Sequence, residues 1–149
     1  MGILENPDEY YMQTALREAR AAMDEDEIPI GAVIVDSTGS IIARAHNQTE
    51  RLHDVTAHAE MLAFTAASEA MGAKYLPDCT LYVTVEPCPM CAGAAGWTQV
   101  GRIVYGAGDP KRGYSLLTGP VLHPKTTVTG GVLEAECTAL MKEFFKKKR

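Results

Sequence analysis

The sequence predicts an α/β layered domain in which helices pack on a central sheet. In some segments apolar residues recur at helical spacing, and in others short β-branched or aromatic runs stand between turn residues. The two kinds of segment alternate along the chain, which favours layers of helix and sheet. The 149 residues are 46% hydrophobic and contain no repeat, low-complexity tract or long linker. We therefore expect a single domain over residues 1–149.

The N-terminal third is expected to form one helix and then a hairpin. After Asn6 and Pro7, apolar side chains recur at helical spacing as far as Met23, with acidic residues in the first turn. The acidic segment 24–29 ends this helix. A strand over Gly31–Asp36, a turn and a second strand over Ile41–Arg44 follow.

The middle of the chain is expected to contain two helices separated by a strand. Residues Ala57–Met71 are rich in good helix formers and precede Gly72, a common helix terminator. Thr80–Thr84 is β-branched and aromatic, which is typical of a strand. Pro89 can occupy a first helical position, so Pro89–Trp97 is expected to be the next helix.

The C-terminal third is expected to hold two short strands and a final helix. Arg102–Tyr105 has strand character, and Lys125–Thr129 has it more weakly. The last helix repeats apolar residues along one face, at Leu133, Cys137, Leu140, Met141 and Phe144.

Composition also bears on the compartment. Apolar stretches fall far short of the roughly 20 residues that a membrane-spanning helix needs, and the N-terminus has no basic signal region. We expect a cytoplasmic protein without a membrane partner. In a reducing compartment the four cysteines are expected to serve metal binding rather than two disulfides.

The net charge of −5 is unevenly distributed. Residues 1–75 contain five basic and thirteen acidic side chains, whereas residues 76–149 contain nine and six. Much of the basic excess lies at Lys142 and in 146–149, and a basic end of this kind can meet phosphate. The alternative is a solvated helix end whose cations complement the helix dipole.

Three residues suggest a metal site. Cys88 and Cys91 form a C-x-x-C pair near the start of a predicted helix, where the dipole and free N–H groups favour thiolates. Redox motifs and structural zinc sites share this pattern, and a reduced pair without metal is a further alternative. His58, thirty residues upstream, supplies a third ligand. Three protein ligands leave the fourth tetrahedral position of zinc for water, which is typical of catalytic sites.

Glu60 is the candidate for proton transfer beside this metal. Deamination of an aromatic ring needs a carboxyl group that moves protons from water to the ring and to the departing ammonia. On an ideal helix, residues two apart point roughly 200° away from one another, so spacing alone does not bring His58 and Glu60 together. We hypothesise that both lie in an irregular first turn.

The motifs H-x-E at 58–60 and P-C-x-x-C at 87–91 match the signature of zinc nucleobase deaminases. The resemblance covers nearly the whole chain, and the chain resembles the bacterial tRNA adenosine deaminases of the cytidine/deoxycytidylate deaminase superfamily. The matching segments are IPIGAV at 28–33, HNQT at 46–49, DVTAHAE at 54–60, LYVTVEPC at 81–88, CAGA at 91–94, YGAGDPKRG at 105–113, VLHP at 121–124, GGVLEAEC at 130–137 and FFKKKR at 144–149.

This resemblance implies a three-layer α/β/α fold of the cytidine-deaminase type, with a central mixed sheet of about five strands. It also implies a homodimer, one zinc ion per chain, and hydrolytic conversion of the wobble adenosine of a tRNA anticodon to inosine. Asn47 matches the family's base-contacting asparagine, and a backbone contact is implied at Ala59. Contacts to the RNA are expected from basic residues, namely Lys111, Arg112, Lys146, Lys147, Lys148 and Arg149.

Two other functions stay open at this point. Pro89 between the cysteines, followed by Trp97, is similar to guanine deaminases, so the substrate could be guanine, cytosine or a free nucleoside. In a nucleic-acid-binding module, Cys79 or Cys137 would close a structural zinc site, although burial as small apolar residues is their default.

Overall fold

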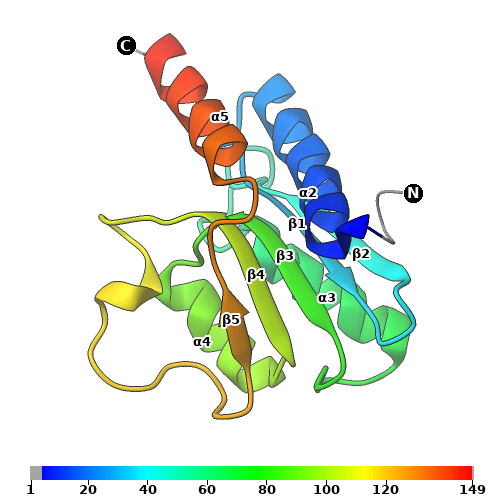
Figure 1. Ribbon diagram of the computed structural model, residues 1–149. Helices are drawn as coiled ribbons and strands as arrows, with labels where there is room; N and C mark the ends of the chain where they lie inside the picture. Colours follow the sequence, from blue (N-terminus) through cyan, green and yellow to red (C-terminus); the bar gives the residue numbers. More distant parts are fainter. Residues whose placement is uncertain (1–4, 149) are drawn as a thin grey trace.

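The computed structural model describes residues 5–148, and its centre is one mixed five-stranded sheet (Figure 1). The strand order is β2-β1-β3-β4-β5. β1 pairs antiparallel with β2 and β3, whereas β3, β4 and β5 run parallel. The strands are β1 (Gly31–Val35), β2 (Ile41–His46), β3 (Thr80–Val85), β4 (Arg102–Ala107) and β5 (Thr127–Thr129).

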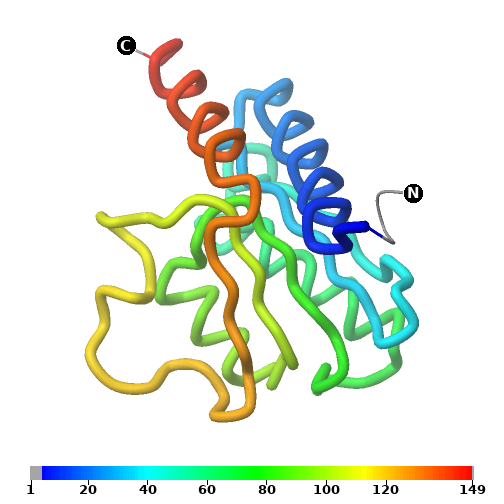
Figure 2. Tube along the Cα trace, in the orientation of Figure 1, coloured from blue at the N-terminus to red at the C-terminus, as the bar shows by residue number. Residues whose placement is uncertain are grey.

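Helices cover both faces of this sheet. α2 (Pro7–Asp24) and α5 (Glu134–Lys147) lie on one face, and α3 (Ala59–Met71) and α4 (Pro89–Thr98) lie on the other (Figure 1). Figure 2 shows the chain between β4 and β5 making a long excursion beside the sheet, which includes a 3-10 turn at Tyr114–Leu116. The expected three-layer α/β/α fold with a mixed sheet of five strands is confirmed.

The two helix layers create two apolar cores, one on each face of the sheet. Along β1, Ala32 and Ile34 face the α3 and α4 core, and Val33 and Val35 face the α2 and α5 core. Successive residues of a strand point to opposite faces, so a strand between two cores must be apolar throughout. For this reason all five residues of β1 are buried.

The predicted elements are present, and their ends differ where tertiary contacts decide. β2 continues to His46 because that residue pairs with Gly31 of β1. α3 begins at Ala59, two residues later than expected, because His58 has an extended backbone with φ −75° and ψ 154°. Leu133 precedes α5 in a left-handed conformation with φ 54°.

Parallel pairing of β3 and β4 puts their carboxyl ends at one edge of the sheet. α4 starts just beyond β3, and α3 packs against β1 and β2 on the same face. The first turns of α3 and α4 therefore meet near the end of β3, where the cysteine motif lies. None of the helices within residues 5–148 is both long and apolar enough to cross a membrane.

Candidate metal centre

The three predicted ligands come together at the first turns of α3 and α4. His58 is the N-cap of α3, Cys88 is the N-cap of α4, and Cys91 lies in the first turn of α4. His58 Nδ1 lies 3.6 Å from Cys88 Sγ and 3.5 Å from Cys91 Sγ. One ligand atom from each residue lies within 4.8 Å of the other two, and this trio is the only such metal-binding group among the described residues.

The spacing of these atoms fits one zinc ion. Zinc–sulfur and zinc–nitrogen bonds of about 2.3 and 2.0 Å put the nitrogen and sulfur ligands of a tetrahedral site roughly 3.5 Å apart. Both His58–cysteine distances match that value. His58, Cys88 and Cys91 are thus positioned to bind one metal ion, and an imidazole with two sulfur ligands is a donor set that suits zinc.

The cysteine pair already has thiolate character. A hydrogen bond from the Cys91 thiol, followed by one from His58, lowers the pKa of Cys88 to about 4. The same contact raises the pKa of Cys91, which keeps its proton while Cys88 is charged. Since the thiolate is the form that binds metal, the site is electrostatically prepared for a cation.

Glu60 lies in the first turn of α3 and is 3% exposed. Burial raises the pKa of its carboxyl to about 7, and the nearby Cys88 and His58 charges act on it with opposite signs. Glu60 Oε1 is the one buried side-chain nitrogen or oxygen atom in residues 5–148 that has no hydrogen-bond partner. A buried carboxyl oxygen without a partner is costly, which is typical of a group kept for chemistry rather than for stability.

The backbone of His58 resolves the geometric problem of the H-x-E motif. His58 stands outside the helix in an extended conformation, whereas Glu60 is helical. Their side chains therefore do not follow the 200° relation that an ideal helix would impose, which is roughly two steps of 100°. The hypothesis that both residues lie in an irregular first turn is therefore wrong for Glu60, which is helical, and only His58 lies outside the helix, as its N-cap.

Asn47 lies directly after β2 and is buried against α3. Its Oδ1 accepts a hydrogen bond of 2.8 Å from the backbone N–H of Ala59. Ala59 stands between His58 and Glu60, so the structure brings both expected substrate-binding residues to the metal centre. The Ala59 N–H is occupied by Asn47, an arrangement that the sequence did not indicate.

The expected RNA-contacting residues are separated into two places. Lys111 and Arg112 lie in the turn after β4, where the Asp109 carboxylate accepts both of their backbone N–H groups. Lys146, Lys147 and Lys148 lie at the end of α5, on the sheet face opposite α3 and α4 (Figure 1). Lys147 pairs with Glu143 at 3.5 Å, and Lys148 pairs with Asp26. Arg149 lies outside the described residues.

Cys79 and Cys137 do not join the metal centre. Cys79 is buried in the core beneath α3 and α4, and Cys137 is buried in the core beneath α2 and α5. Neither belongs to the metal-binding trio. The default interpretation of both as buried apolar residues holds, and the structural-zinc alternative lacks its fourth ligand.

Two buried carboxylates near the site were missed by sequence reasoning. Glu27 accepts backbone N–H groups of the loop after β2, and Glu86 accepts those of Asp109 and Ser115 in the loop after β4. Gly113 packs so closely on Glu86 that a Cβ there would lie 2.4 Å from the carboxyl carbon. The acidic run 24–27 does not indicate which of its side chains is buried, because the backbone N–H groups that bind Glu27 belong to a loop that is distant in the sequence.

Known proteins with the same features support this description. A family model described as the cytidine and deoxycytidylate deaminase zinc-binding region matches residues 5–107. The tRNA-specific adenosine deaminase of Bacillus subtilis strain 168 is 47% identical over 147 residues, covering 95% of this chain and 91% of that protein.

Two solved structures have a similar fold. One, from work on A-to-I editing by tRNA:A34 deaminases at the wobble position of transfer RNA, has a TM-score of 0.82 at 44% identity and covers 88% of this chain and 98% of that one. A guanine deaminase from Nitrosomonas europaea has a TM-score of 0.79 at 27% identity and covers 91% and 83%. Both resemblances extend over most of the fold.

Proposed function

Because this chain belongs to the cytidine and deoxycytidylate deaminase family, we infer that it hydrolyses the wobble adenosine of a tRNA anticodon to inosine. Water adds its oxygen to C6 of the adenine ring, and the amino group leaves as ammonia. The observation that carries this function is the metal-binding trio His58, Cys88 and Cys91 with the buried carboxyl of Glu60 beside it.

His58, Cys88 and Cys91 would hold the zinc ion, which when bound acts as a Lewis acid and lowers the pKa of water toward neutrality. Glu60 is the proton carrier in this proposal. A pKa of about 7 lets the carboxyl accept a first proton from water and donate it to the ring nitrogen, and then carry the second proton, from the hydroxyl added to C6, to the departing amino group. Burial of Glu60 keeps bulk water from competing for that proton.

Asn47 and Ala59 are proposed to orient the substrate. The Asn47 oxygen is engaged by Ala59, which fixes the side chain and leaves the two amide hydrogens as donors for a ligand. A donor held in this way loses little conformational entropy when substrate binds. Sequence spacing alone made Asn47 an ordinary turn residue.

Transfer RNA is favoured over a free base as the substrate. Identity to the tRNA-specific enzyme of Bacillus subtilis is 47% over 95% of this chain, against 27% over 91% to the guanine deaminase of Nitrosomonas europaea and 40% over only 67% to that of Bacillus subtilis. Lys111 and Arg112 would grip the anticodon backbone, and the cations at 146–149 would meet a more distant part of the tRNA. RNA recognition of this kind depends on local basic patches because the net charge is −5.

A homodimer in the cytoplasm completes the proposal. Trp97 of α4 is 84% exposed, and Leu116 and Leu117 in the excursion after β4 are also exposed. Exposed apolar groups of this size are typical of an interface, for which a second copy is the proposed occupant. A reducing compartment keeps Cys88 and Cys91 available as metal ligands.

A substrate panel tests the function. Purified zinc-loaded protein is incubated separately with tRNA, guanine, cytosine and free adenosine, and inosine and released ammonia are measured. Inosine at the wobble position of tRNA, with little ammonia from the small molecules, is the expected result. If ammonia were released from guanine and no inosine formed in tRNA, the protein would be a guanine deaminase and the proposed function would be wrong.

A further inference from the structure

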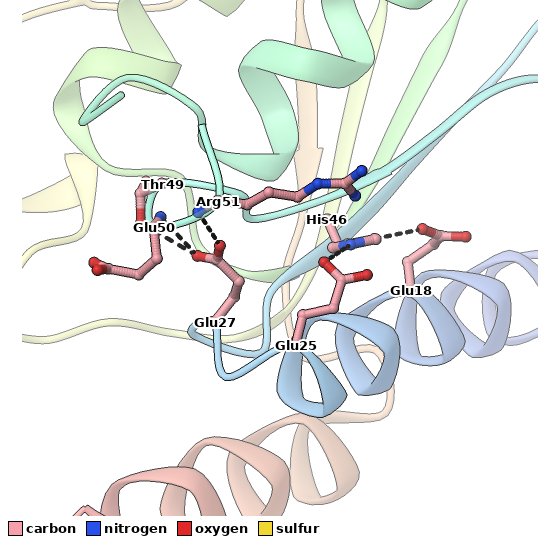
Figure 3. A network of polar contacts seen from close by, with 7 residues as sticks. All are labelled: Glu18, Glu25, Glu27, His46, Thr49, Glu50 and Arg51. Atoms are coloured by element: carbon pink, nitrogen blue, oxygen red, sulfur yellow. Dashed lines mark hydrogen bonds and ion pairs between the residues drawn. The ribbon is translucent and has the colours of Figure 1, made fainter. Parts of the chain in front are cut away.

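Glu27 is a carboxylate buried at the root of the loop that follows β2. It is 1% exposed and lies just beyond α2, where its backbone N–H donates to Ala22. Its side chain accepts the backbone N–H groups of Glu50 at 3.1 Å and Arg51 at 2.8 Å (Figure 3). The Thr49 hydroxyl donates to it at 3.4 Å. Hydrogen bonds from these three donors offset the free-energy cost of burying the carboxylate, which would be large without them.

The loop that Glu27 holds begins and ends at the metal centre. The Gln48 N–H donates to Ala57 at 3.0 Å, which closes the loop at the residue before His58. Between these ends Leu52 and Val55 are exposed, Val55 by 84%. The loop is thus fixed at its base and exposes apolar side chains next to the site.

Asn47 stands between two anchors, and Glu27 provides one of them. On the preceding side, the ring of His46 lies between two carboxylates of the α2 region, 3.0 Å from Glu18 and 3.2 Å from Glu25 (Figure 3). On the following side, residues 49–51 are held by Glu27. Because Asn47 Oδ1 accepts from Ala59, a shift of the loop moves the contact at the start of α3.

We propose that Glu27 is a positioning residue for the deaminase site, which sets the place of Asn47 through the backbone of residues 49–51. This inference rests on the proposed function and adds to it a group that does not touch substrate. Asn47 contacts the substrate, and Glu27 acts on the substrate only through Asn47. The competing interpretation is that Glu27 stabilises the fold and has no effect on substrate binding.

Glu27→Gln is the informative variant, because it keeps the size of the side chain but leaves one accepting oxygen in place of two. Glu27→Asp keeps the charge and shortens the reach, and it serves if the first variant folds poorly. Glu69→Gln, at an exposed position of α3, makes the same chemical change away from the loop and is the matched control. Each protein is prepared with zinc, and its zinc content is measured.

The first measurement is hydrogen exchange over residues 47–59, which needs no substrate. Glu27→Gln is expected to speed exchange of the Glu50, Arg51 and Ala59 amides at least roughly tenfold, with zinc content unchanged and Glu69→Gln like the wild type. Unchanged exchange in both Glu27 variants would overturn the proposal. Failure of the wild type to edit tRNA would contradict the proposed function instead, while the exchange data would still decide whether Glu27 holds the loop.

The second measurement is a double-mutant cycle with an RNA anticodon stem-loop. Glu27→Gln is expected to raise KM roughly tenfold and to change kcat less than about threefold. In an Asn47→Ala background the same substitution is expected to change KM less than about twofold, because the residue through which it acts is gone. An equal effect in both backgrounds, or an effect confined to thermal stability, would show that Glu27 does not act through Asn47.

Discussion

The N-termini of α2 and α3 differ in whether the side chain of the N-cap residue caps the helix. α2 has a regular N-terminus, where the Asn6 side chain accepts from the Glu9 N–H at 3.2 Å and Pro7 takes the first helical position. The N-cap residues of α3 and α4 are His58 and Cys88, and neither side chain caps its helix. Histidine and cysteine are not favoured N-cap residues, so local stability is given up at these two ends.

The difference separates residues that stabilise the fold from residues that serve the site. At α2 the side chain of the N-cap residue is used within its own helix, whereas His58 and Cys88 are turned toward each other across two helices. An extended backbone at both positions directs the side chains away from the helix axis. Departures from local rules of this kind are expected at functional sites.

The largest effect is expected at Glu60. Glu60→Ala removes the proton carrier and should lower kcat on tRNA by roughly 10²- to 10⁴-fold, because general acid–base catalysis contributes about that much. Zinc content and the circular dichroism spectrum should match the wild type, and Glu69→Ala on the same helix serves as control. Turnover near the wild-type rate would remove Glu60 from the mechanism.

The metal ligands come next. Cys91→Ala should reduce bound zinc well below one ion per chain, with loss of activity and a lower Tm, since metal binding adds to folding stability. Zinc is measured by atomic emission after dialysis. Cys79→Ala is the matched control, because this cysteine is equally buried and lies outside the metal-binding trio. Full zinc content in Cys91→Ala would contradict the ligand assignment.

Changes at the C-terminal end of α5 test whether the layer of α2 and α5 contributes to tRNA binding as well as to stability. Removing residues 146–149 should weaken tRNA binding roughly three- to tenfold at one fixed salt concentration and flatten its salt dependence, because fewer counterions are released. Changing the same four residues to Gln distinguishes charge from length. Stability should change little, since the Lys148–Asp26 and Lys147–Glu143 pairs are largely exposed. Equal affinity in all three proteins would exclude an RNA contact there.

Asn6→Ala tests the regular helix start directly. Loss of the cap should lower the free energy of unfolding by about 1 kcal/mol, measured by urea denaturation. Asn6→Ser preserves a capping oxygen and should recover most of that loss. Activity well below Tm should be unchanged in both, because α2 lies on the sheet face opposite α3 and α4, whose first turns form the metal centre. A Tm for Asn6→Ala equal to that of the wild type would mean that the cap contributes nothing.

The smallest effect concerns Asp8 in the first turn of α2. Bidentate hydrogen bonds from Arg102 at 2.8 and 2.9 Å, and one from Tyr82, hold the pKa of Asp8 below its ordinary value despite partial burial. A depressed folded-state pKa stabilises the fold above the unfolded-state pKa of about 4, and that contribution is lost as pH falls through the folded value.

Asp8→Asn should therefore be less stable than the wild type at pH 7 by roughly 0.2–1 kcal/mol, the range for partly exposed ion pairs. The difference in the free energy of unfolding between the two proteins should narrow as the pH falls below about 4. Urea denaturation of both proteins at pH 7, 5, 4 and 3 measures it. A gap that is constant over this range would mean that ionisation of Asp8 does not stabilise the fold.

Much of the fold was predictable because each element carries its own pattern. The spacing of apolar residues predicted α2, and the hairpin of β1 and β2 followed from two apolar runs around the turn at 37–40. Ends of elements were less predictable. β2 runs on to His46 through pairing with Gly31, a residue fifteen positions away, which no local pattern contains.

The sequence by itself determined the chemistry of the site, because the types and number of ligands at His58, Cys88 and Cys91 suit an open zinc site and the H-x-E motif supplies a carboxyl. Tertiary structure decided what spacing left open. It put His58 outside α3, which lets His58 and Glu60 share one site, and it moved the cations of α5 to the opposite face of the sheet. It also buried Glu27 under the loop after β2. The physical reason is that ligand identity is a property of single residues, whereas direction, burial and partners depend on chain segments that only folding brings together.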